Sequence, residues 1–451
     1  MRKKKNASIF LTLLLALIMF SGLSGCQKET GPLRILVDIV GNAEQREKDA
    51  NTVKDYLRLH GYTGEIEIET LPTEGADRTM ALTRIRTEVM AGGGPDIFIV
   101  GNHTEYSERE GRNLCTSLFL MPEKSMELGL FLPLDEYLEK AQYIEPDKMT
   151  PVVMEAGYSE KWGQTILPMT YSFSATFFDK GDMPQLPQVN TWDEMLADDT
   201  LVFQAAAAKP QKRDWSHFPA SFGVLADYKN KQLAFTEEEL LQRINEFFVV
   251  EDRHKAGAFS GLLPYYQSEM GIYFWMDNTI LEDNARNGND ALTDYFPGVQ
   301  EDIDGVVRKD FTIAPVYSDD GGITATIDAF AAINANTKRP DNAFAALDIL
   351  FGTEAYQTLN IFGFSSNSLV TRDDLYTADL PVRCHHLTDE NWAELDRVRS
   401  EITHANFAGT IFTELNVMFG HCIGINEGYL EGTIEEEIAT TYSRMRKELS
   451  E

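Results

Sequence analysis

Hydrophobic and polar positions follow strand and helix periods in turn along the first part of the chain. Residues 33–37 form an apolar run of strand length, and residues 44–60 carry apolar side chains at helical spacing. Residues 65–69 alternate glutamate with isoleucine, residues 77–90 return to the helical period, and residues 96–100 form another apolar run. This β-α-β-α-β order predicts a mostly parallel sheet with helices on both faces, and such sheets bind ligands at the carboxyl ends of their strands.

The Gly-Gly-Gly-Pro turn at residues 92–95 separates the second predicted helix from the third strand. In nucleotide-binding units the glycines follow a strand and open a helix, whose N-terminal N–H groups meet the phosphate. Here the glycines follow a helix and precede a strand, so their order excludes a phosphate cradle. We expect Asp96, directly after the turn, to brace it.

Two capping-box patterns predict helices in the second half of the chain. Thr236 with Glu239, and Thr433 with Glu436, each precede a stripe of apolar residues at helical spacing. Glutamates cluster in the first turn of both helices, where the helix dipole stabilises negative charge. These clusters therefore indicate a solvated surface and not calcium sites. Both stripes are expected to pack into the core.

The chain is strongly acidic, with 71 Asp and Glu against 40 Lys and Arg residues and a formal net charge of −31. Such a surface repels phosphate backbones and anionic headgroups, so nucleic acid is excluded as a partner. The length of 451 residues is enough for two or three domains with cores of their own.

Cysteine and histidine residues give no sign of a cofactor or a reaction. Cys115, Cys384 and Cys422 are widely spaced, so no disulfide framework is implied, although one pair is left open. His385–His386 and His421–Cys422 lack further ligands at metal-site spacing. HExxH, GxSxG and P-loop motifs are absent from the sequence. We therefore expect no metal, no cofactor and no catalytic residues.

The N-terminus has the pattern of an export signal. Lysine and arginine at positions 2–5 precede the apolar run 9–20, which is short for a membrane span. The end of the segment, Leu23-Ser24-Gly25-Cys26, resembles the lipobox of bacterial lipoproteins. This resemblance implies that residues 1–25 are removed, that Cys26 is lipidated, and that residues 26–32 form a tether. The alternatives are an ordinary secretory signal and a single-span anchor. Loss of residues 1–25 takes the charge from −31 to −35, because they hold four cations and no anion.

Several segments resemble, in the same order, the family 1 extracellular solute-binding proteins of ABC transporters. The first is the helix, Gly-rich turn, Pro-Asp and apolar strand of residues 90–98. The others are residues 162–168 with 174–180, the Thr-Trp-Asp-Glu helix start at 191–195, residues 270–275, and residues 311–315 with 329–344. The resemblance covers most of residues 33–450.

This resemblance implies a two-lobed α/β fold of the type II periplasmic-binding-protein kind, in which each lobe is a mostly parallel sheet flanked by helices. We expect residues 33–172 and 318–362 in an N-terminal lobe, and residues 173–317 and 363–451 in a C-terminal lobe. A hinge between the lobes closes on the ligand.

Candidate ligand-binding residues are polar or aromatic side chains that follow strands. Sugars are recognised by aromatic faces together with amides and carboxylates that bond to neighbouring hydroxyls. These criteria select Asn42, Asn102, His103, Tyr171 and Ser172 in the first lobe, and Trp215, Tyr273, Trp275, Asp277, Ser366 and Asn367 in the second. The alternative roles are core packing for the aromatic run 273–276 and helix capping for Asn42, Asn102 and His103.

The sequence predicts a monomeric receptor, tethered to the membrane through Cys26, that captures a small solute and delivers it to an ABC permease. A mono- or oligosaccharide is the expected solute. A peptide, a polyamine or a metal chelate is the alternative cargo, and a sensor kinase is the alternative partner. A secreted glycan-active enzyme is the alternative from another class, because two facing carboxylates are not excluded by the sequence.

Overall fold

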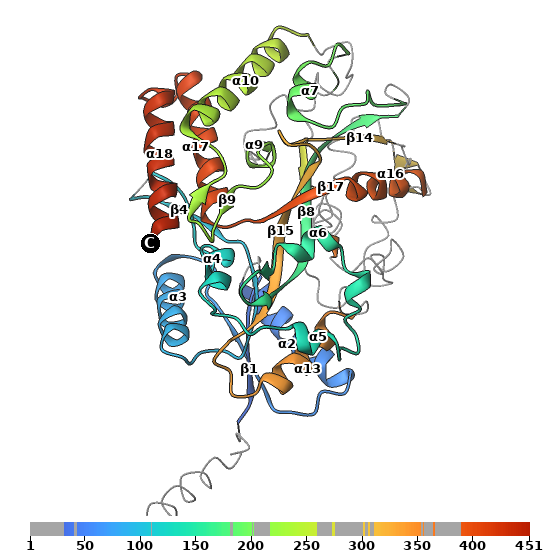
Figure 1. Cartoon of the computed structure of the whole chain (residues 1–451), viewed down its shortest axis with the longest axis vertical. Coiled ribbons are helices and arrows are strands. Elements are labelled where there is room, and N and C mark those ends of the chain that lie inside the picture. The colour runs from blue at the N-terminus through green and yellow to red at the C-terminus, as the bar shows by residue number, and fades with distance from the viewer. Residues whose placement is uncertain are drawn as a thin grey trace, which may run out of the picture. The chain divides into compact units, whose positions relative to one another are not determined.

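The elements predicted for the first part of the chain are present in the computed structural model (Figure 1). In chain order they are β1 (Leu33–Asp38), α2 (Ala43–Leu59), β2 (Ile66–Thr70), α3 (Gly75–Met90) and β3 (Ile97–Gly101). Strand β1 lies between β2 and β3 and is parallel to both, with Ile35 opposite Ile68 and Ile97. The prediction of a parallel β-α-β-α-β unit is confirmed.

The structure describes residues 31–39, 43–109, 111–180, 184–200, 202, 217–258, 273–275, 301–302, 305–306, 311–352, 355, 364–365 and 389–451. Leu33–Glu451 forms one compact unit. Its sheet carries apolar residues on both faces: Leu33, Ile35 and Val37 of β1 pack with α2, whereas Leu36 packs on the opposite face with α3. Burial on both faces explains why β1 and β3 are continuous apolar runs.

Asp96 braces the glycine turn after α3, as expected. Gly92 and Gly94 have φ of +80° and +93°, in the left-handed region that favours glycine. The Asp96 carboxylate accepts hydrogen bonds from the Arg34 N–H at 2.9 Å and from the Thr337 hydroxyl at 2.5 Å. These bonds join the turn to β1 and to the segment before α13 (Pro340–Leu350).

Two long strands, β8 (Ile166–Asp179) and β15 (Ile323–Ile333), connect the remaining strands into one nine-stranded sheet. The order of the main path is β11-β8-β15-β3-β1-β2. Further strands pair off this path: β14 (Phe311–Pro315) and β16 (Phe364–Ser365) with β8, and β17 (Ile402–Phe407) with β15. Pairings of β8 are antiparallel, whereas β17 is parallel to β15.

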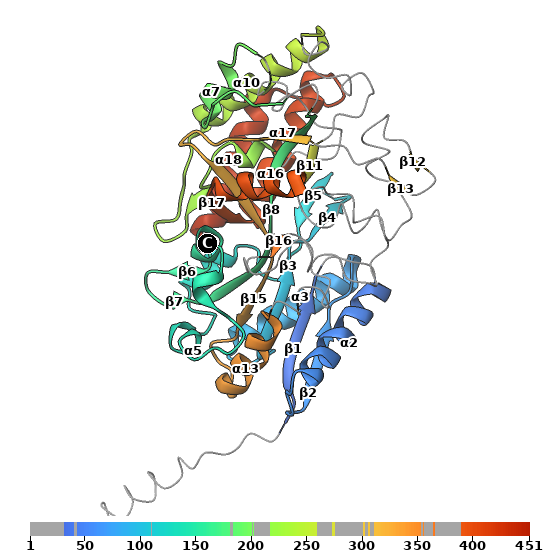
Figure 2. The ribbon, with the colours of Figure 1, turned by 90° about the vertical axis from the view of Figure 1, so that its right-hand side faces the viewer.

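Helices cover the sheet and extend beyond one end of it (Figures 1 and 2). They are α4 (Pro122–Glu127), α5 (Asp135–Leu138), α6 (Pro151–Glu155), α7 (Trp192–Leu196), α9 (His217–Ala220), α10 (Glu237–Lys255), α13 (Pro340–Leu350), α16 (Asp389–Ser400), α17 (Thr410–Asn426) and α18 (Ile434–Ser450), with a 3-10 turn at Pro146–Lys148. Short strands form hairpins: β4 (Thr104–Ser107) with β5 (Arg112–Cys115), β6 (Tyr158–Ser159) with β7 (Gly163–Gln164), β9 (Ala226–Asp227) with β10 (Gln232–Leu233), and β12 (Glu301–Asp302) with β13 (Gly305–Val306). Strand β11 spans Tyr273–Trp275.

Both predicted capping boxes begin helices. The Thr236 hydroxyl accepts from the Glu239 N–H at 3.2 Å, and the Glu239 carboxylate accepts from the Thr236 N–H at 2.6 Å. The Thr433 hydroxyl accepts from the Glu436 N–H at 3.2 Å. The apolar stripes that follow are in the core, as expected.

The described part of the chain contains no helix that is both long and apolar enough to span a membrane. The same residues include no group of three or more His, Cys, Asp or Glu side chains placed to hold a metal ion. Cys115 and Cys422 are free thiols. Cys384 and the His385–His386 pair lie outside the described residues.

Candidate functional site

Both long strands change partners at the same level of the sheet. Residues 329–333 of β15 lie against β3, and its residues 323–327 lie against β17. Strand β8 pairs with β15 through residues 166–170 and with β14 through residues 175–179. Asp328 therefore separates the two pairing segments of β15. We call the part of the molecule that holds β1, β2 and β3 the β1 side, and the part that holds β14 and β17 the β17 side.

A hydrogen bond joins the two strands where they change partners. The hydroxyl of Ser172, which is fully buried, donates to Asp328 Oδ1 at 3.0 Å. The backbone carbonyl of Asp328 also accepts from the Asn102 N–H at 3.3 Å. Asn102 and Ser172, two of the predicted ligand residues, are thus brought together through Asp328.

The carboxyl end of β1 adds a buried charged group. Asp38, the last residue of β1, is 0% exposed and Arg78 of α3 is 1% exposed. The guanidinium donates two 3.0 Å bonds to the two oxygens of this carboxylate. His103 Nε2 lies 3.4 Å from Asp38 Oδ1. Charge pairing and the fork geometry together satisfy a carboxylate that burial would otherwise make costly.

Asn102 and His103 lie between β3 and β4, so the alternative role of helix capping is wrong for both of them. Ser117 holds the pair: its hydroxyl accepts from the His103 N–H at 2.8 Å and donates to Asn102 Oδ1 at 3.1 Å. Because backbone and side-chain bonds fix both residues, their side chains keep their positions at the strand end.

Tyr171 precedes Ser172 in β8 and is 1% exposed. Its hydroxyl accepts from Arg399 Nε of α16 at 2.9 Å, and the Arg399 guanidinium also lies 5.9 Å from the ring centroid. Tyr171 therefore contributes to the site through this contact and not through an open ring face. A row of polar side chains results, which we call the polar row: Asp38, Arg78, Asn102, His103, Ser172, Asp328 and Arg399.

The other predicted ligand residues are described in part or not at all. For Tyr273 and Trp275 only the backbone is described: β11 is antiparallel to β8, with Trp275 opposite Ser174, two residues beyond Ser172. Their strand thus lies next to the point where β8 changes partners. Asn42, Trp215, Asp277, Ser366 and Asn367 lie outside the described residues.

Four members of the polar row were not predicted from the sequence. Asp38 ends an apolar run at the same strand terminus that drew attention to Asn42, so its position was a usable signal. Asp328 is an acidic residue inside the apolar run of residues 323–333, which is also a visible signal. Arg78 lies in a predicted helical segment, and Arg399 lies in a polar helical segment. Neither position carries such a signal.

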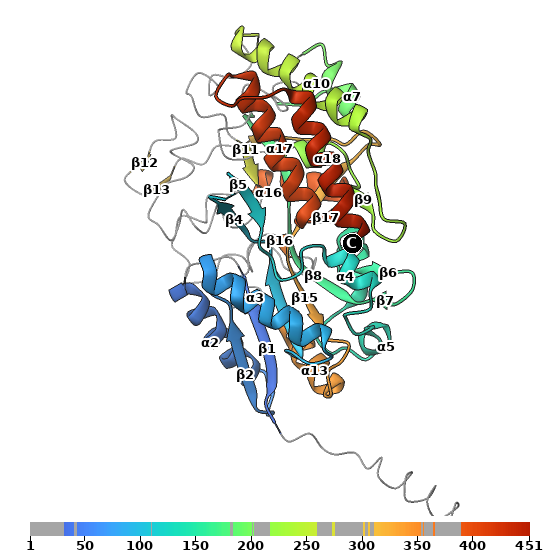
Figure 3. The same cartoon turned by 90° about the vertical axis from the view of Figure 1, so that its left-hand side faces the viewer.

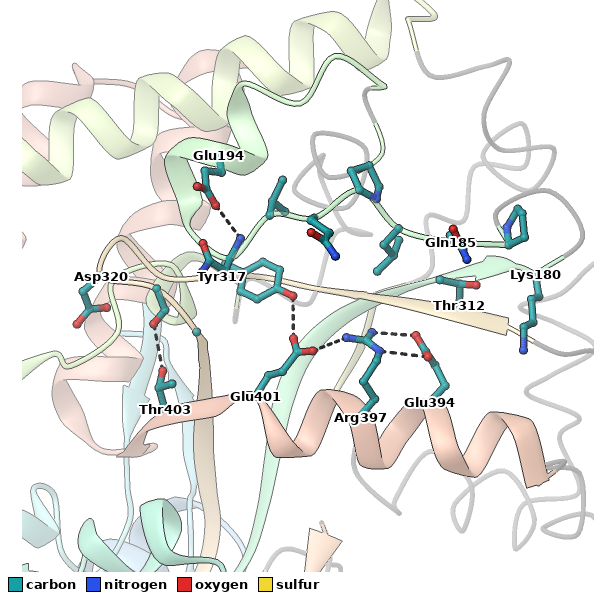
Figure 4. Close-up of a pocket in the computed structure, with 18 residues that line it drawn as sticks. Lys180, Gln185, Glu194, Thr312, Tyr317, Asp320, Glu394, Arg397, Glu401 and Thr403 are labelled. Carbon is teal, nitrogen blue, oxygen red and sulfur yellow. Dashed lines mark hydrogen bonds and ion pairs between the residues drawn. The ribbon is translucent and has the colours of Figure 1, made fainter.

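A separate groove of about 1130 Å³ lies on the β17 side between α16 and the segment 184–190 (Figure 4). In its wall the Tyr317 hydroxyl donates to Glu401 at 2.9 Å, and Arg397 donates to Glu401 at 2.7 Å and to Glu394 at 2.8 Å. Burial and the neighbouring Glu401 raise the pKa of Tyr317, which stays protonated. No residue of the polar row lines the groove.

The described members of the polar row supply both donors and acceptors of hydrogen bonds. The Asp38 carboxylate accepts from Arg78, and the Asp328 carboxylate accepts from the Ser172 hydroxyl. Amide, imidazole and guanidinium groups supply hydrogen bonds of fixed direction, which is what a specific binding site for a polar molecule requires.

Comparison with solved structures identifies the fold. A family 1 extracellular solute-binding protein from Alicyclobacillus acidocaldarius is 14% identical, with a TM-score of 0.54 over 94% of this chain and 100% of that chain. A periplasmic oligogalacturonide binding protein from Yersinia enterocolitica is 15% identical, with a TM-score of 0.54 over 93% and 99% of the two chains. The sugar-binding protein MalE from Xanthomonas citri is 13% identical, with a TM-score of 0.51 over 93% and 98%. No protein-family model matches the sequence, and no curated protein matches it.

The chain has the two-lobed α/β fold of the extracellular solute-binding proteins, which confirms the predicted fold class. The sheet is mixed where a mostly parallel one was expected in each lobe, because β11, β14 and β16 all pair with β8 antiparallel. At the level of structure it is similar to the family 1 members, as the order of its sequence segments indicated. The predicted lobe boundaries remain a prediction.

Proposed function

We propose that this protein is an extracytoplasmic receptor that binds a small carbohydrate and delivers it to an ABC permease. The observation that carries the proposal is the polar row, which lies where β8 and β15 change partners and at the carboxyl ends of β1 and β3. In a hinged two-lobed fold, a ligand at this place contacts both lobes only when they are closed, so binding energy drives closure.

A carbohydrate is favoured by the chemistry of the row. Amide, carboxylate and guanidinium groups make paired hydrogen bonds to neighbouring hydroxyls, and β11 brings the backbone of an aromatic segment, Tyr273–Trp275, beside Ser174. Two of the structures similar in fold are named for sugar ligands, an oligogalacturonide and a sugar. Oligogalacturonides and neutral oligosaccharides are therefore the first ligands to test.

The test is thermal unfolding of the purified chain against a panel of oligosaccharides, peptides and polyamines. A ligand present at a hundredfold excess over its dissociation constant stabilises the protein by about 2.7 kcal/mol. We expect a saccharide to raise the melting temperature, and His103→Ala to remove the rise. Gln188→Ala, which changes the separate groove, is the matched control and should leave the rise unchanged. A shift with polyamines or peptides alone would refute the carbohydrate assignment, and turnover of a glycan would refute the receptor.

We propose further that the mature chain begins at Cys26 and is anchored through a lipid on this residue. The support is the sequence pattern of residues 1–26, since these residues lie outside the described part. Expression with a palmitate analogue should label the wild-type chain and leave Cys26→Ser unlabelled. Equal labelling of both proteins would refute the anchor.

A further inference from the structure

A second buried ion pair connects the β1 side to the β17 side. Arg112 of hairpin β4–β5 donates to both oxygens of Glu414 in α17, at 2.7 and 2.8 Å. The two side chains are 8% and 6% exposed. Arg444 of α18, which is 30% exposed, donates to the same carboxylate at 2.6 Å. Figure 3 shows the hairpin beside α17 and α18, with α3 below it.

The residues that follow β5 are fixed to the β1 side. Arg78 donates to the Thr116 carbonyl at 2.8 Å, and the Thr116 N–H donates to the His103 carbonyl at 2.7 Å. Arg86 of α3 donates to the carbonyls of Ser117 at 2.7 Å and Leu118 at 2.9 Å. The base of the hairpin therefore belongs mechanically to the β1 side and to the polar row.

The same segment also contacts the β17 side at two further points. The Leu120 carbonyl accepts from the Thr410 N–H at 2.7 Å, and Lys124 donates to the Glu448 carbonyl at 2.9 Å. Residues 112–124 thus form a strap, bonded to α3 on one side and to α17 and α18 on the other. Any motion that separates the two sides acts on this strap.

We propose that Arg112, Glu414 and Arg444 form a latch that sets the balance between closed and open arrangements of the two sides before a ligand binds. A buried carboxylate that loses its partner costs several kcal/mol. Glu414 avoids this cost, because Arg444 moves with it on the β17 side and stays bonded when Arg112 leaves. The Glu414 carboxylate therefore alternates between two guanidinium partners and one, so its contact with Arg112 opens reversibly. This inference rests on the hinged receptor proposed above.

The test measures the separation of the two sides without any ligand. Spin labels on unnatural amino acids at Asp55 in α2 and Glu238 in α10, both exposed, report it in the full-length chain in detergent by pulsed electron spin resonance. We expect Glu414→Gln to add a population with a longer distance. Arg444→Gln leaves the Arg112–Glu414 pair in place. It should shift the distance distribution toward shorter distances or leave it unchanged, because release of Arg112 would then leave the Glu414 carboxylate without a guanidinium partner.

Arg243→Gln is the matched control. Arg243 is also buried and paired with carboxylates, Glu246 and Asp319, but these lie within the β17 side. It should lower the melting temperature without changing the distance. A Glu414→Gln protein that is less stable yet has the wild-type distances would overturn the latch and leave a structural ion pair. Since no ligand is used, this result would leave the proposed receptor function standing.

Discussion

Two buried arginine–carboxylate pairs of nearly the same geometry differ in position, because one lies within the β1 side and the other connects the β1 side to the β17 side. Arg78 binds Asp38 within the β1 side, and the same two terminal nitrogens also donate to the carbonyls of Pro72 and Thr116. Arg112 binds Glu414 across the two sides, where Arg444 supplies a second cation. We therefore expect the Arg78–Asp38 contact to persist and the Arg112–Glu414 contact to be exchangeable, although both have the same fork-shaped geometry.

This difference shows that burial alone does not fix the role of an ion pair. Asp38 has Arg78 as its guanidinium partner among the described residues, so separation of that pair removes the guanidinium that compensates a buried charge. Glu414 has two guanidinium partners on different elements, so the loss of one is compensated. Position relative to the moving parts, and the number of partners, decide whether a pair supports the fold or a conformational change.

The largest effect is expected from Arg78→Met, which leaves Asp38 buried beside His103. We expect a loss of about 3 to 5 kcal/mol in the free energy of unfolding, the range for breaking one partner of a buried pair. Arg112→Met is the matched variant and should cost less, because Arg444 still binds Glu414. Urea denaturation of both proteins measures the two losses. Equal losses would contradict the distinction between the pairs.

A third carboxyl, that of half-buried Glu123 in α4, extends the comparison because it has no arginine among its partners in the described structure. Its Oε2 is shielded from solvent and makes no hydrogen bond there. Burial raises the pKa of Glu123 to about 7, against hydrogen bonds from backbone groups and Tyr228 that act to lower it. In the unfolded chain the pKa is about 4.5, so the folded state binds the extra proton.

This raised pKa gives a pH dependence with a definite sign. The stabilising contribution is complete below pH 4.5 and is lost as the pH rises toward 7, over which stability falls by on the order of 2 to 3 kcal/mol. Glu123→Gln keeps the shape of the side chain and removes the titration. Urea midpoints between pH 4.5 and 7.5 should therefore decline for the wild type and stay flatter for the variant. Parallel curves for the two proteins would disprove the assignment.

Local pattern was enough to predict the elements of the β1 side. Strands β1 and β3 are continuous apolar runs because they are buried on both faces, and helices α2 and α3 carry apolar side chains at helical spacing. Asn102, His103, Tyr171 and Ser172 were found for the same reason, since each lies at or near the end of a run that the pattern defines.

Pairing across distant segments could not be predicted in this way. Nothing local in Arg112 indicates Glu414, which is 302 residues away, or in Arg399 indicates Tyr171, which is 228 residues away. Such contacts depend on the path of β8 and β15 through the sheet. A single sequence records each residue type but not its partner, so three of the seven members of the polar row were predicted and the strap was not predicted.

The smallest effect is expected at the contact that joins β8 to β15. Ser172→Ala removes the donor to Asp328 Oδ1 and should lower the free energy of unfolding by about 1.5 kcal/mol, the lower end for a hydrogen bond to a charged group. Thr324→Val is the matched control, because its buried hydroxyl in β15, the strand of Asp328, donates to the Ala220 carbonyl at 3.0 Å, away from the polar row. Both variants should lose some stability, but only Ser172→Ala should change the distance between the labels at Asp55 and Glu238. If Thr324→Val changes that distance equally, the Ser172–Asp328 contact does not specifically control the separation of the two sides. The two ion pairs compared above would then differ only in the number of guanidinium groups that bind each carboxylate.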